Sequence, residues 1–378
     1  MHKINLHVYP TVFKYESRIL KETETLGSSS IFDRIIIAVL RKTKFGVEEI
    51  DKDRNVMYLP VYVDPQSASA LAKLFIFFIF YFKLYFHFHN TKVSCINCHS
   101  VSVLPICVLL KWSNRCKLVY DPHELETETI SSRGLRKKMV KLVEKKLIPF
   151  ADAVIVVSGS IAEWYKNTYQ LKNVFVVRNV PKKPNAVTTP SDDLKARLHM
   201  RHDSILFLYN GMLSEGRGIE LLLKIFSSLI TPDKHIVFLG YGPLEQNVRS
   251  YSENYQNIHY CSAVSPEKVI DFIRRADVGL SIIENVCLSY KYCLPNKLFE
   301  YLLSGIPVIV SNFPDMVEIV EKYNCGWRVD VSEISIAALI NSITYSEIQG
   351  KQKHLRSCPV PINWEAESSK LLDVYASI

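Results

Sequence analysis

The sequence predicts an α/β protein made of two open parallel-sheet domains, and three observations support this prediction. Continuous apolar, β-branched runs alternate with helix-like stretches, which is typical of parallel strands covered by helices on both faces. The alternation stops at a proline-rich segment near residue 180 and then starts afresh. The length of 378 residues favours two domains over one. We therefore expect ligands to bind in a cleft between the carboxyl ends of the two sheets.

The first domain is predicted over residues 1–180. Its expected strands are short apolar runs, at 4–9, 34–40, 93–98, 117–120 and 153–157. Its expected helices carry apolar residues every three to four positions, at 17–26, 71–88, 133–146 and 160–169. This order predicts a parallel sheet with helices on both faces.

The second domain is predicted over residues 201–360, after a linker at 181–200. Residues 179–193 contain three prolines and no periodic apolar residues, which indicates a connection between domains. The strand and helix alternation then returns, with strands at 205–209, 235–239, 278–282 and 307–310 and helices at 219–229, 266–275 and 296–303. Residues 361–378 are predicted to form a last helix.

Composition excludes several classes of protein. The net charge is +8, but the basic residues do not form a base-reading motif, so no nucleic-acid partner is expected. The nine cysteines are scattered, several of them in apolar runs, which indicates reduced thiols in a cytosolic protein. Cys95 and Cys98 have zinc-knuckle spacing without a second pair, so no metal site is expected. The first ten residues lack the pattern of a signal peptide.

Two segments leave a role at a membrane open. The uninterrupted apolar part of 71–88 is about nine residues long, roughly half of a spanning helix, so it is either a helix buried against the sheet or one that also touches lipid. Residues 133–146 have one strongly basic helical face, which is either solvated or attracted to anionic lipid.

A glycine-rich loop follows the strand at 205–209. Gly211, Gly216 and Gly218 would let backbone amides turn toward a phosphate at a helix start, and Arg217 would add a fork of donors. A nucleoside triphosphatase is disfavoured, because Arg217 and Gly218 stand where a P-loop needs Lys and a hydroxyl residue. The alternative is an ordinary connection with a surface Arg. Gly242 is expected in a second tight turn, where the third glycine of a dinucleotide fingerprint is replaced by Glu245.

The segment 294–302 carries the most specific signal. Leu294, Pro295 and Asn296 precede or start a helix, so its first amides are free for a ligand. Lys297 could neutralise phosphate, and Glu300 could accept hydrogen bonds from the two hydroxyls of a ribose. The alternative is an amphipathic helix with surface charges.

Polar side chains also follow two strands of the first domain. His99 comes directly after the strand at 93–98, and His123 and Glu124 come just after the strand at 117–120. Both histidines thus lie at carboxyl ends of parallel strands, where ligands bind in such folds. A lone histidine is usually structural, whereas two at equivalent strand ends also fit a functional role, so both interpretations stay open.

Taken together, these motifs resemble the retaining glycosyltransferases of family four, also called group 1, which have the GT-B fold. The resemblance covers nearly the whole chain, through segments 17–22, 104–105, 120–125, 151–158, 178–181, 211–218, 295–302 and 305–308. It implies two Rossmann-like domains facing across a cleft. It also implies that the helix opened by 363–365 crosses back to the first domain.

The resemblance also implies roles for single residues. Arg217 and Lys297 would hold the donor diphosphate, Glu300 the ribose, and His99 would lie by the transferred sugar. The acceptor side would be lined by Arg18, His123 and Glu124. The wider donor site would comprise Gly211, Gly216, Gly218, Gly242, Val264, Leu294, Pro295 and Asn296. No metal and no cofactor would be required, since the nucleotide-diphosphate sugar is a co-substrate.

Two positions depart from the family pattern. Met212 stands where the donor loop usually has a second basic residue, and Tyr292 stands where an acid would pair with Glu300. The resemblance therefore assigns neither the contacts to the donor sugar nor the identity of that sugar.

The sequence thus predicts a retaining hexosyltransferase that uses a nucleotide sugar and a saccharide acceptor, expected to be lipid-linked. By family analogy the setting is capsule or O-antigen assembly, by a cytoplasmic enzyme peripheral on an anionic membrane face. The alternatives are a nucleotide-sugar epimerase of the same fold and a non-catalytic sugar- or membrane-binding protein. Asp51 and Asp53 form a DxD motif that would suit a metal-dependent transferase, but they lie in a polar stretch interpreted as a solvated loop.

Overall fold

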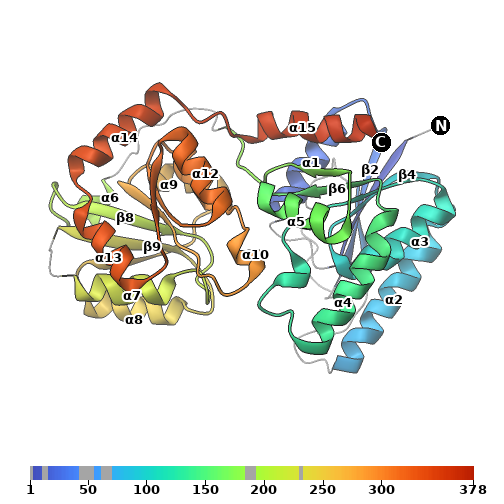
Figure 1. Cartoon of the computed structure of the whole chain (residues 1–378), viewed down its shortest axis with the longest axis horizontal. Helices are drawn as coiled ribbons and strands as arrows, with labels where there is room; N and C mark the ends of the chain where they lie inside the picture. The colour runs from blue at the N-terminus through green and yellow to red at the C-terminus, as the bar shows by residue number, and fades with distance from the viewer. Residues whose placement is uncertain (1–2, 11–15, 42–54, 61–69, 184–192, 230–232) are drawn as a thin grey trace. The chain divides into compact units, whose positions relative to one another are not determined.

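The computed structural model describes residues 3–10, 16–41, 55–60, 70–183, 193–229 and 233–378 (Figure 1). The chain divides into two compact units, one formed by Met1–Arg178 with Glu367–Ile378 and the other by Asn179–Ala366. The first boundary falls two residues before the predicted end at 180. The DxD motif at 51–53 lies outside the described residues.

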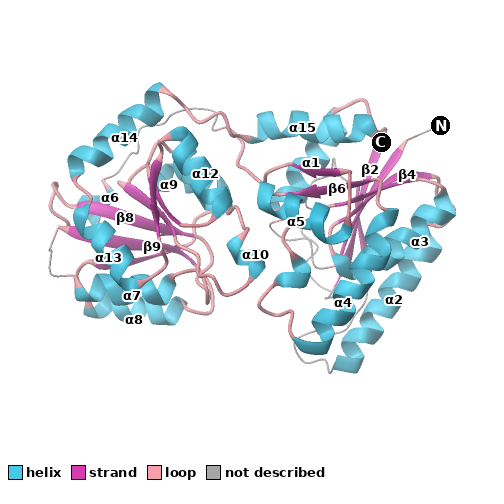
Figure 2. Cartoon of the chain, in the orientation of Figure 1, coloured by secondary structure: helices cyan, strands magenta, loops and turns pink. Residues whose placement is uncertain are grey.

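The first unit is built on a seven-stranded parallel sheet (Figure 2). The strands are β1 (Ile4–Tyr9), β2 (Arg34–Arg41), β3 (Asn55–Pro60), β4 (Val93–Cys98), β5 (Lys117–Tyr120), β6 (Ala153–Val156) and β7 (Val174–Val176), in the order β3-β2-β1-β4-β5-β6-β7. The order reverses direction between β1 and β4, which lie side by side although more than eighty residues separate them. Ligands of open α/β sheets bind at such a reversal point.

Helices cover both faces of this sheet, as the apolar strands predict. They are α1 (Ser17–Ser28), α2 (Ala70–Phe88), α3 (Leu104–Asn114), α4 (Gly134–Leu147) and α5 (Gly159–Tyr169). The sequence reasoning did not assign α3. Its signal is Pro105 in the first turn, where the missing amide hydrogen costs nothing.

The second unit is built on a six-stranded parallel sheet in the order β10-β9-β8-β11-β12-β13. The strands are β8 (Ile205–Asn210), β9 (Lys234–Gly240), β10 (Ile258–Ser262), β11 (Val278–Ser281), β12 (Val308–Ser311) and β13 (Gly326–Val329). The helices are α6 (Leu194–Arg197), α7 (Ile219–Ser228), α8 (Glu245–Asn254), α9 (Pro266–Ile273), α10 (Leu288–Lys291), α11 (Asn296–Leu303), α12 (Pro314–Tyr323), α13 (Glu333–Ser342) and α14 (Tyr345–Ser357). Its core is formed by buried side chains of β8, β9 and β11 with those of α7.

The last helix, α15 (Trp364–Ser377), begins in the second unit and ends in the first. Within the first unit, the Arg178 backbone N–H donates to Glu367 Oε2 at 2.8 Å, and Asn97 Nδ2 donates to the Tyr375 hydroxyl. The predicted fold class, with two parallel sheets and a returning last helix, is therefore confirmed.

The differences from the prediction lie at the sheet edges, in the linker and in five helices of the second unit that were not predicted, α8, α10, α12, α13 and α14. The edge strands β3, β7, β10 and β13 were not predicted. In β10 and β13 polar residues or glycine interrupt the apolar ones, and β7 is only three residues long, so none of these three gives the signal of a buried strand. Helix α6 lies within the predicted linker. It forms because Asp193 Oδ1 accepts hydrogen bonds from the backbone N–H groups of Lys195 and Ala196.

All nine cysteines are free thiols, and Cys95, Cys98 and Cys107 are buried.

Helix α2 buries one face while leaving phenylalanines exposed on another. Within the described ranges, none of the helices is both long and apolar enough to cross a bilayer.

Candidate active site

In the second unit, most of the residues singled out from the sequence lie at one edge of the sheet. The strands are all parallel, so the carboxyl ends of β8, β9, β10 and β11 meet at this edge. The loops that follow them, together with the start of α11, contain the predicted donor-side residues Gly211, Gly216, Arg217, Gly218, Gly242, Val264, Leu294, Pro295, Asn296, Lys297 and Glu300. The sheet therefore brings together segments that are up to ninety residues apart.

Lys297 occupies the centre of this group, in the first turn of α11. Its side chain is buried, with 8% exposed, and Nζ lies 3.5 Å from the centroid of the Tyr209 ring. Nζ has no hydrogen-bond partner within the described residues. Burial and the neighbouring Arg217 charge hold the pKa of Lys297 well below its usual range, while Glu300 acts in the opposite direction. A buried cation with unsatisfied donors is a site that an anion would stabilise.

Arg217 lies in the glycine-rich loop before α7. Its guanidinium carbon is 4.4 Å from the centroid of the Tyr290 ring, in cation–π geometry. The aromatic ring holds the guanidinium without taking up all of its N–H donors. Because Arg217 also acts electrostatically on Lys297, two like charges meet here and would be neutralised together by a diphosphate.

The glycine-rich loop is fixed by backbone contacts from two neighbouring loops. Leu213 N–H donates to Tyr241 O and Leu244 N–H donates to Leu213 O, both at 2.9 Å. Gly242 has φ +153°, and an added Cβ would lie 2.4 Å from Leu213 O, so no larger residue fits this contact. The loops after β8 and β9 thus form one rigid unit.

A second anchor comes from Glu284, in the loop after β11. The Gly218 N–H donates to Glu284 Oε1 at 3.2 Å, and the Glu284 N–H donates to Gly216 O at 2.9 Å. The carboxylate at the start of α7 thus satisfies one of the amides that a helix start leaves open.

Helix α11 is pinned to the sheet by Tyr301. Its hydroxyl accepts a hydrogen bond from the Asn210 N–H at 2.9 Å and lies within donating distance of the carbonyls of Leu208 and Leu280. The ring passes over Gly279, where an added Cβ would lie 2.3 Å from Tyr301 Cγ. This insertion fixes the position of Lys297, one helical turn before Tyr301.

Glu300 is held from the strand end as well. Asn210 Nδ2 donates to Glu300 Oε2 at 2.6 Å, which orients the carboxylate toward the end of β8. Pro295 is the N-cap of α11, Leu294 is buried before it, and Val264 follows β10. The remaining carboxylate lone pairs of Glu300 can accept hydrogen bonds from a diol.

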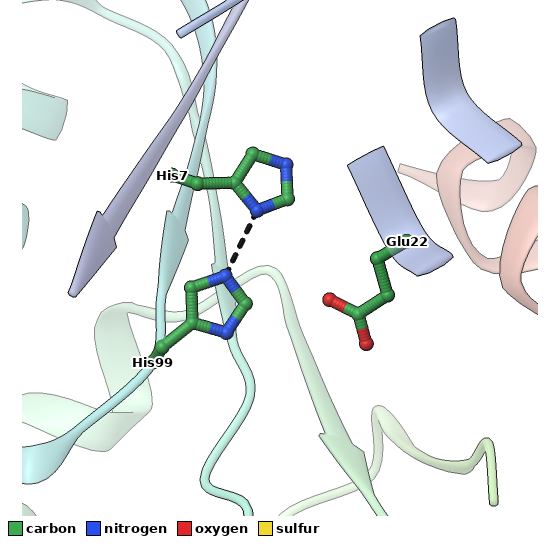
Figure 3. A group of neighbouring side chains, drawn as sticks. All are labelled: His7, Glu22 and His99. Atoms are coloured by element: carbon green, nitrogen blue, oxygen red, sulfur yellow. Dashed lines mark hydrogen bonds between the residues drawn. The ribbon is translucent and has the colours of Figure 1, made fainter. Parts of the chain in front are cut away.

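In the first unit, three histidines form a continuous hydrogen-bonded chain. Asn5 Oδ1 lies 2.6 Å from His7 Nε2, His7 Nδ1 lies 2.8 Å from His99 Nε2, and His99 Nδ1 lies 3.3 Å from His123 Nε2. Figure 3 shows the bond between the first two rings. His99 is thus almost completely buried, with both ring nitrogens engaged, whereas His123 is partly exposed at the end of β5.

The hydrogen-bond partners assign the tautomers of this chain. The Asn5 amide nitrogen donates to Cys95 O and Asn97 Oδ1, so Asn5 Oδ1 must accept from His7 Nε2. A neutral His7 then accepts from His99, and a neutral His99 accepts from His123. Burial lowers the pKa of His7 to about 3 and that of His123 to about 4, and holds the pKa of His99 well below its ordinary value. All three rings are therefore neutral near pH 7.

Arg18, Asp121 and Glu22 form a buried ion-paired group beside the histidines. Arg18 Nη2 lies 2.9 Å from Asp121 Oδ1, and Arg18 Nε lies 3.0 Å from Glu22 Oε1. Burial acts to raise the pKa of Asp121, but the Arg18 charge outweighs it and holds that pKa well below its usual range. Burial and Asp121 raise the pKa of Glu22 well above its usual range. Arg18, predicted on the acceptor side, is thus buried in contacts of its own unit, and Glu124 is exposed.

Among the described residues of this unit, two groups have the donor atoms of a metal site. They are His7, Glu22 and His99, drawn in Figure 3, and His99, Asp121 and His123, with donor atoms within 4.8 Å of one another in each group. The Arg18 guanidinium already supplies a positive charge to both carboxylates. A divalent cation would meet that charge at close range, so the residues fit an ion-paired network better than a cation site.

Sequence reasoning missed three residues that shape the site in the second unit, namely Tyr209, Tyr290 and Glu284. Their contacts with Lys297, Arg217 and Gly218 join segments far apart in the chain, so no local spacing reveals them. The signal that was present for Tyr209 is its place next to Asn210 at the end of an otherwise apolar strand.

Two family models match consecutive parts of the chain. Residues 47–180 match the family described as Glycosyltransferase Family 4, and residues 190–356 match the family described as Glycosyl transferases group 1. Together these matches cover most of both units.

Curated relatives and solved structures agree with these matches. The chitobiosyldiphosphodolichol beta-mannosyltransferase of Kluyveromyces lactis is 22% identical over 310 residues, which are 72% of this chain and 68% of that protein. The lipopolysaccharide 1,2-N-acetylglucosaminetransferase of Salmonella typhimurium is 23% identical over 229 residues, which are 57% of this chain and 53% of that protein. The structure of Anabaena HepE in complex with UDP-glucose superposes with a TM-score of 0.75 and 13% identity, over 100% of both chains. The last likeness is one of fold.

Proposed function

The chain belongs to the group 1 family of glycosyltransferases and has the GT-B fold, and on this basis we propose that it transfers a sugar with retention of configuration from a nucleotide-diphosphate sugar to a saccharide acceptor. The observation that carries the proposal is the buried Lys297 ammonium, which has no hydrogen-bond partner within the described residues and lies in the field of Arg217. This pair fits a diphosphate.

The second unit supplies the donor site in this proposal. Arg217 and Lys297 hold the diphosphate, and Glu300 binds the ribose hydroxyls one helical turn further on. Amides at the starts of α7 and α11 add hydrogen bonds, because the first turn of a helix leaves its N–H groups unpaired. The UDP-glucose complex of the Anabaena protein supports a nucleotide sugar as the ligand of this fold.

Retention implies that the acceptor hydroxyl attacks from the face that the diphosphate is leaving. The departing phosphate oxygen takes the proton of the attacking hydroxyl, so the reaction needs no dedicated side-chain base. The work of the protein is to position the reactants and to stabilise negative charge on the leaving group. Arg217 and Lys297 provide that charge stabilisation, and we propose that no metal ion is required.

In the first unit, we propose that His123 faces the ligands and that His99 acts through it. His99 was expected beside the transferred sugar, but its ring is buried and both nitrogens are engaged. The chain from Asn5 fixes the His123 tautomer, which leaves Nδ1 as an acceptor for a sugar hydroxyl. Glu124 lies on the acceptor side, and Arg18 positions Asp121 behind the histidines.

The relatives suggest the class of acceptor. One of them is named for a chitobiosyl-diphosphodolichol acceptor and the other for lipopolysaccharide. We therefore propose a lipid-linked saccharide acceptor and a role in surface-polysaccharide assembly on the cytoplasmic side of a membrane. We also propose that two residues influence which donor sugar binds, because they depart from the family pattern. They are Met212, which is exposed, and Tyr292, which follows α10.

The test begins with a panel of nucleotide sugars in a thermal-shift assay. A ligand that binds only the folded chain raises the melting temperature, which identifies both the base and the sugar. The selected donor is then incubated with lipid-linked saccharides, and the anomeric configuration of the product is read by NMR. Since the Kluyveromyces relative is named for a beta linkage, the stereochemistry needs this direct measurement.

The same assay separates the alternatives. An epimerase converts the nucleotide sugar without any acceptor, and a binding protein shifts the melting temperature but turns over none of the acceptors. EDTA should leave transfer intact. Loss of transfer with EDTA and its recovery with manganese would refute metal independence, and an inverted product would refute retention.

A further inference from the structure

Helix α4 of the first unit has its polarity inverted. Among its fourteen residues, all of them described, the buried one is the acidic Glu144. Its large apolar residues face outward instead, with exposed fractions of 74% for Leu135, 61% for Met139 and 56% for Leu142. A helix on the surface of a water-soluble domain normally buries such side chains and exposes the acid. Among the described residues of the first unit, none covers this apolar face.

Specific contacts hold α4 in this orientation. The Glu144 carboxylate accepts hydrogen bonds from three tyrosine hydroxyls, at 2.8 Å from Tyr120, 2.9 Å from Tyr165 and 2.7 Å from Tyr169. Lys137 and Lys141 both form ion pairs with Glu128. Rotating the helix to bury its leucines would remove the carboxylate from three hydroxyl donors, two of them on buried tyrosines, so the apolar side is held outward.

Helix α2 exposes a row of phenylalanines. Ile76, Phe80, Leu84 and Phe88 point inward and are buried. The outward row consists of Phe75, Phe78, Phe82 and Phe86, each more than half exposed. The helix is thus apolar on its outer face as well as on its inner one.

Helix α3 packs against both α2 and α4, so the three helices lie next to one another (Figure 1, light blue to green). It exposes Leu109 and Trp112, and the Trp112 ring lies 5.2 Å from the ring of Phe150, just after α4. We call these outward faces of α2, α3 and α4 the three-helix surface. Soluble domains rarely expose so many large apolar side chains on neighbouring elements.

The charge of the three-helix surface has one sign. Helices α2 and α3 contain no acidic residue, and the one acid of α4 is the buried Glu144. Within the described residues, no ion pair engages four basic residues of α4, namely Arg136, Lys138, Lys145 and Lys146. Large apolar side chains interleaved with unpaired basic ones complement a surface that is apolar below and negative above.

We propose that the three-helix surface docks the first unit onto an anionic lipid bilayer. The phenylalanines of α2 and the leucines of α4 enter the boundary between headgroups and acyl chains, and the basic side chains of α4 meet lipid phosphates. A second copy of this chain fits less well, since it would bring two basic helices together. The proposal does not depend on the proposed glycosyl transfer, because vesicle binding needs neither donor nor acceptor.

The test is cosedimentation of the full chain with vesicles of phosphatidylcholine alone and of phosphatidylcholine with phosphatidylglycerol. We expect binding to the anionic vesicles, weakened by salt, and little binding to the neutral ones. Arg136→Gln with Lys138→Gln should weaken binding by about tenfold or more, and Phe82→Ser with Phe86→Ser should do the same. These side chains are exposed, so the variants should fold like the wild type.

Matched controls come from the second unit. Ile334→Ser removes an apolar side chain that is 83% exposed, and Lys353→Gln removes an exposed charge; neither should change vesicle binding. The proposal is overturned if the wild type stays in the supernatant with anionic vesicles at low salt, or if the α2 and α4 variants bind as well as the wild type. Dimers that the phenylalanine variants abolish, without vesicle binding, would assign the surface to a second copy instead.

Discussion

The two units gather charged groups at the carboxyl edges of their sheets in opposite ways. In the first unit, the Arg18 guanidinium contacts Asp121, Glu22 and the carbonyl of Val177, all inside the same unit. In the second, Lys297 is also buried, but its Nζ has no hydrogen-bond partner within the described part of the chain. A buried cation that is already paired with carboxylates supports the structure. A buried cation whose N–H groups have no acceptor is suited to an anionic ligand. The comparison therefore separates a scaffold from a binding site.

The largest expected effect is on the stability of the first unit. Arg18→Ala should reduce the free energy of unfolding by about 3–5 kcal/mol, because it leaves the Asp121 carboxylate charged, buried and unpaired. Urea denaturation measures the loss, and hydrogen exchange in β1 and β5 places it in the first unit. The control is Lys166→Ala, which breaks the exposed pair with Glu163 and should cost about 0.5 kcal/mol or less. Equal losses in the two variants would remove the contrast between buried and surface pairs.

The next effect separates function from stability in the second unit. Arg217→Ala should lower the rate of transfer by roughly 10²–10³-fold, the scale of losing one preorganised donor to the leaving group. Its melting temperature should stay near that of the wild type, since within the described region the Arg217 side chain is held by the Tyr290 ring and not by an ion pair. Arg201→Ala, which removes an exposed charge paired with Asp203, should leave transfer unchanged. Near-normal transfer by Arg217→Ala at limiting donor contradicts its role.

The contrast between the units also explains what could be predicted from the sequence. The central strands are buried on both faces, so they are continuous apolar runs, and the spacing of Lys297 and Glu300 within one helical turn is a local pattern. The burial of Lys297 against Tyr209 is not local. It depends on Tyr301 packing over Gly279 and hydrogen-bonding to β8 and β11, which no spacing in the sequence encodes.

The same limit applies in the first unit. His99 and His123 were placed at equivalent strand ends from the sequence, and their ring nitrogens lie 3.3 Å apart. His7 was not associated with them, because it lies within β1, and the pairing of β1 with β4 joins positions about ninety residues apart. The histidine chain is thus a product of strand order, which the alternation of strands and helices does not specify.

A smaller effect should appear in the pH dependence of stability. Below pH 6.5 an unfolded chain binds a proton on His7, whereas the folded chain, in which burial lowers that pKa to about 3, does not. Stability should therefore fall as the pH drops from 7 to 5, by about 2 kcal/mol for this one residue. His7→Asn should be less sensitive by that amount. The buried Glu126 acts in the opposite direction, because burial raises its pKa to about 8. Comparing the two proteins removes this contribution. Parallel pH profiles of the two proteins would contradict the neutral histidine chain.

The smallest expected effect concerns the charge of Lys297 in the second unit. In the free protein, burial and Arg217 hold the pKa of Lys297 well below its usual range, and a bound diphosphate should restore it. Binding then takes up a proton wherever the free amine is partly neutral, so affinity falls as pH rises, by at most about tenfold per unit. Calorimetry of UDP or GDP binding in buffers with different ionisation enthalpies measures this uptake. Lys297→Met should bind more weakly and show no uptake, while Lys353→Gln should match the wild type. If the heat of binding to the wild type is the same in every buffer, Lys297 is already fully charged before the ligand binds. That result would contradict the predicted proton uptake and the contrast with Arg18.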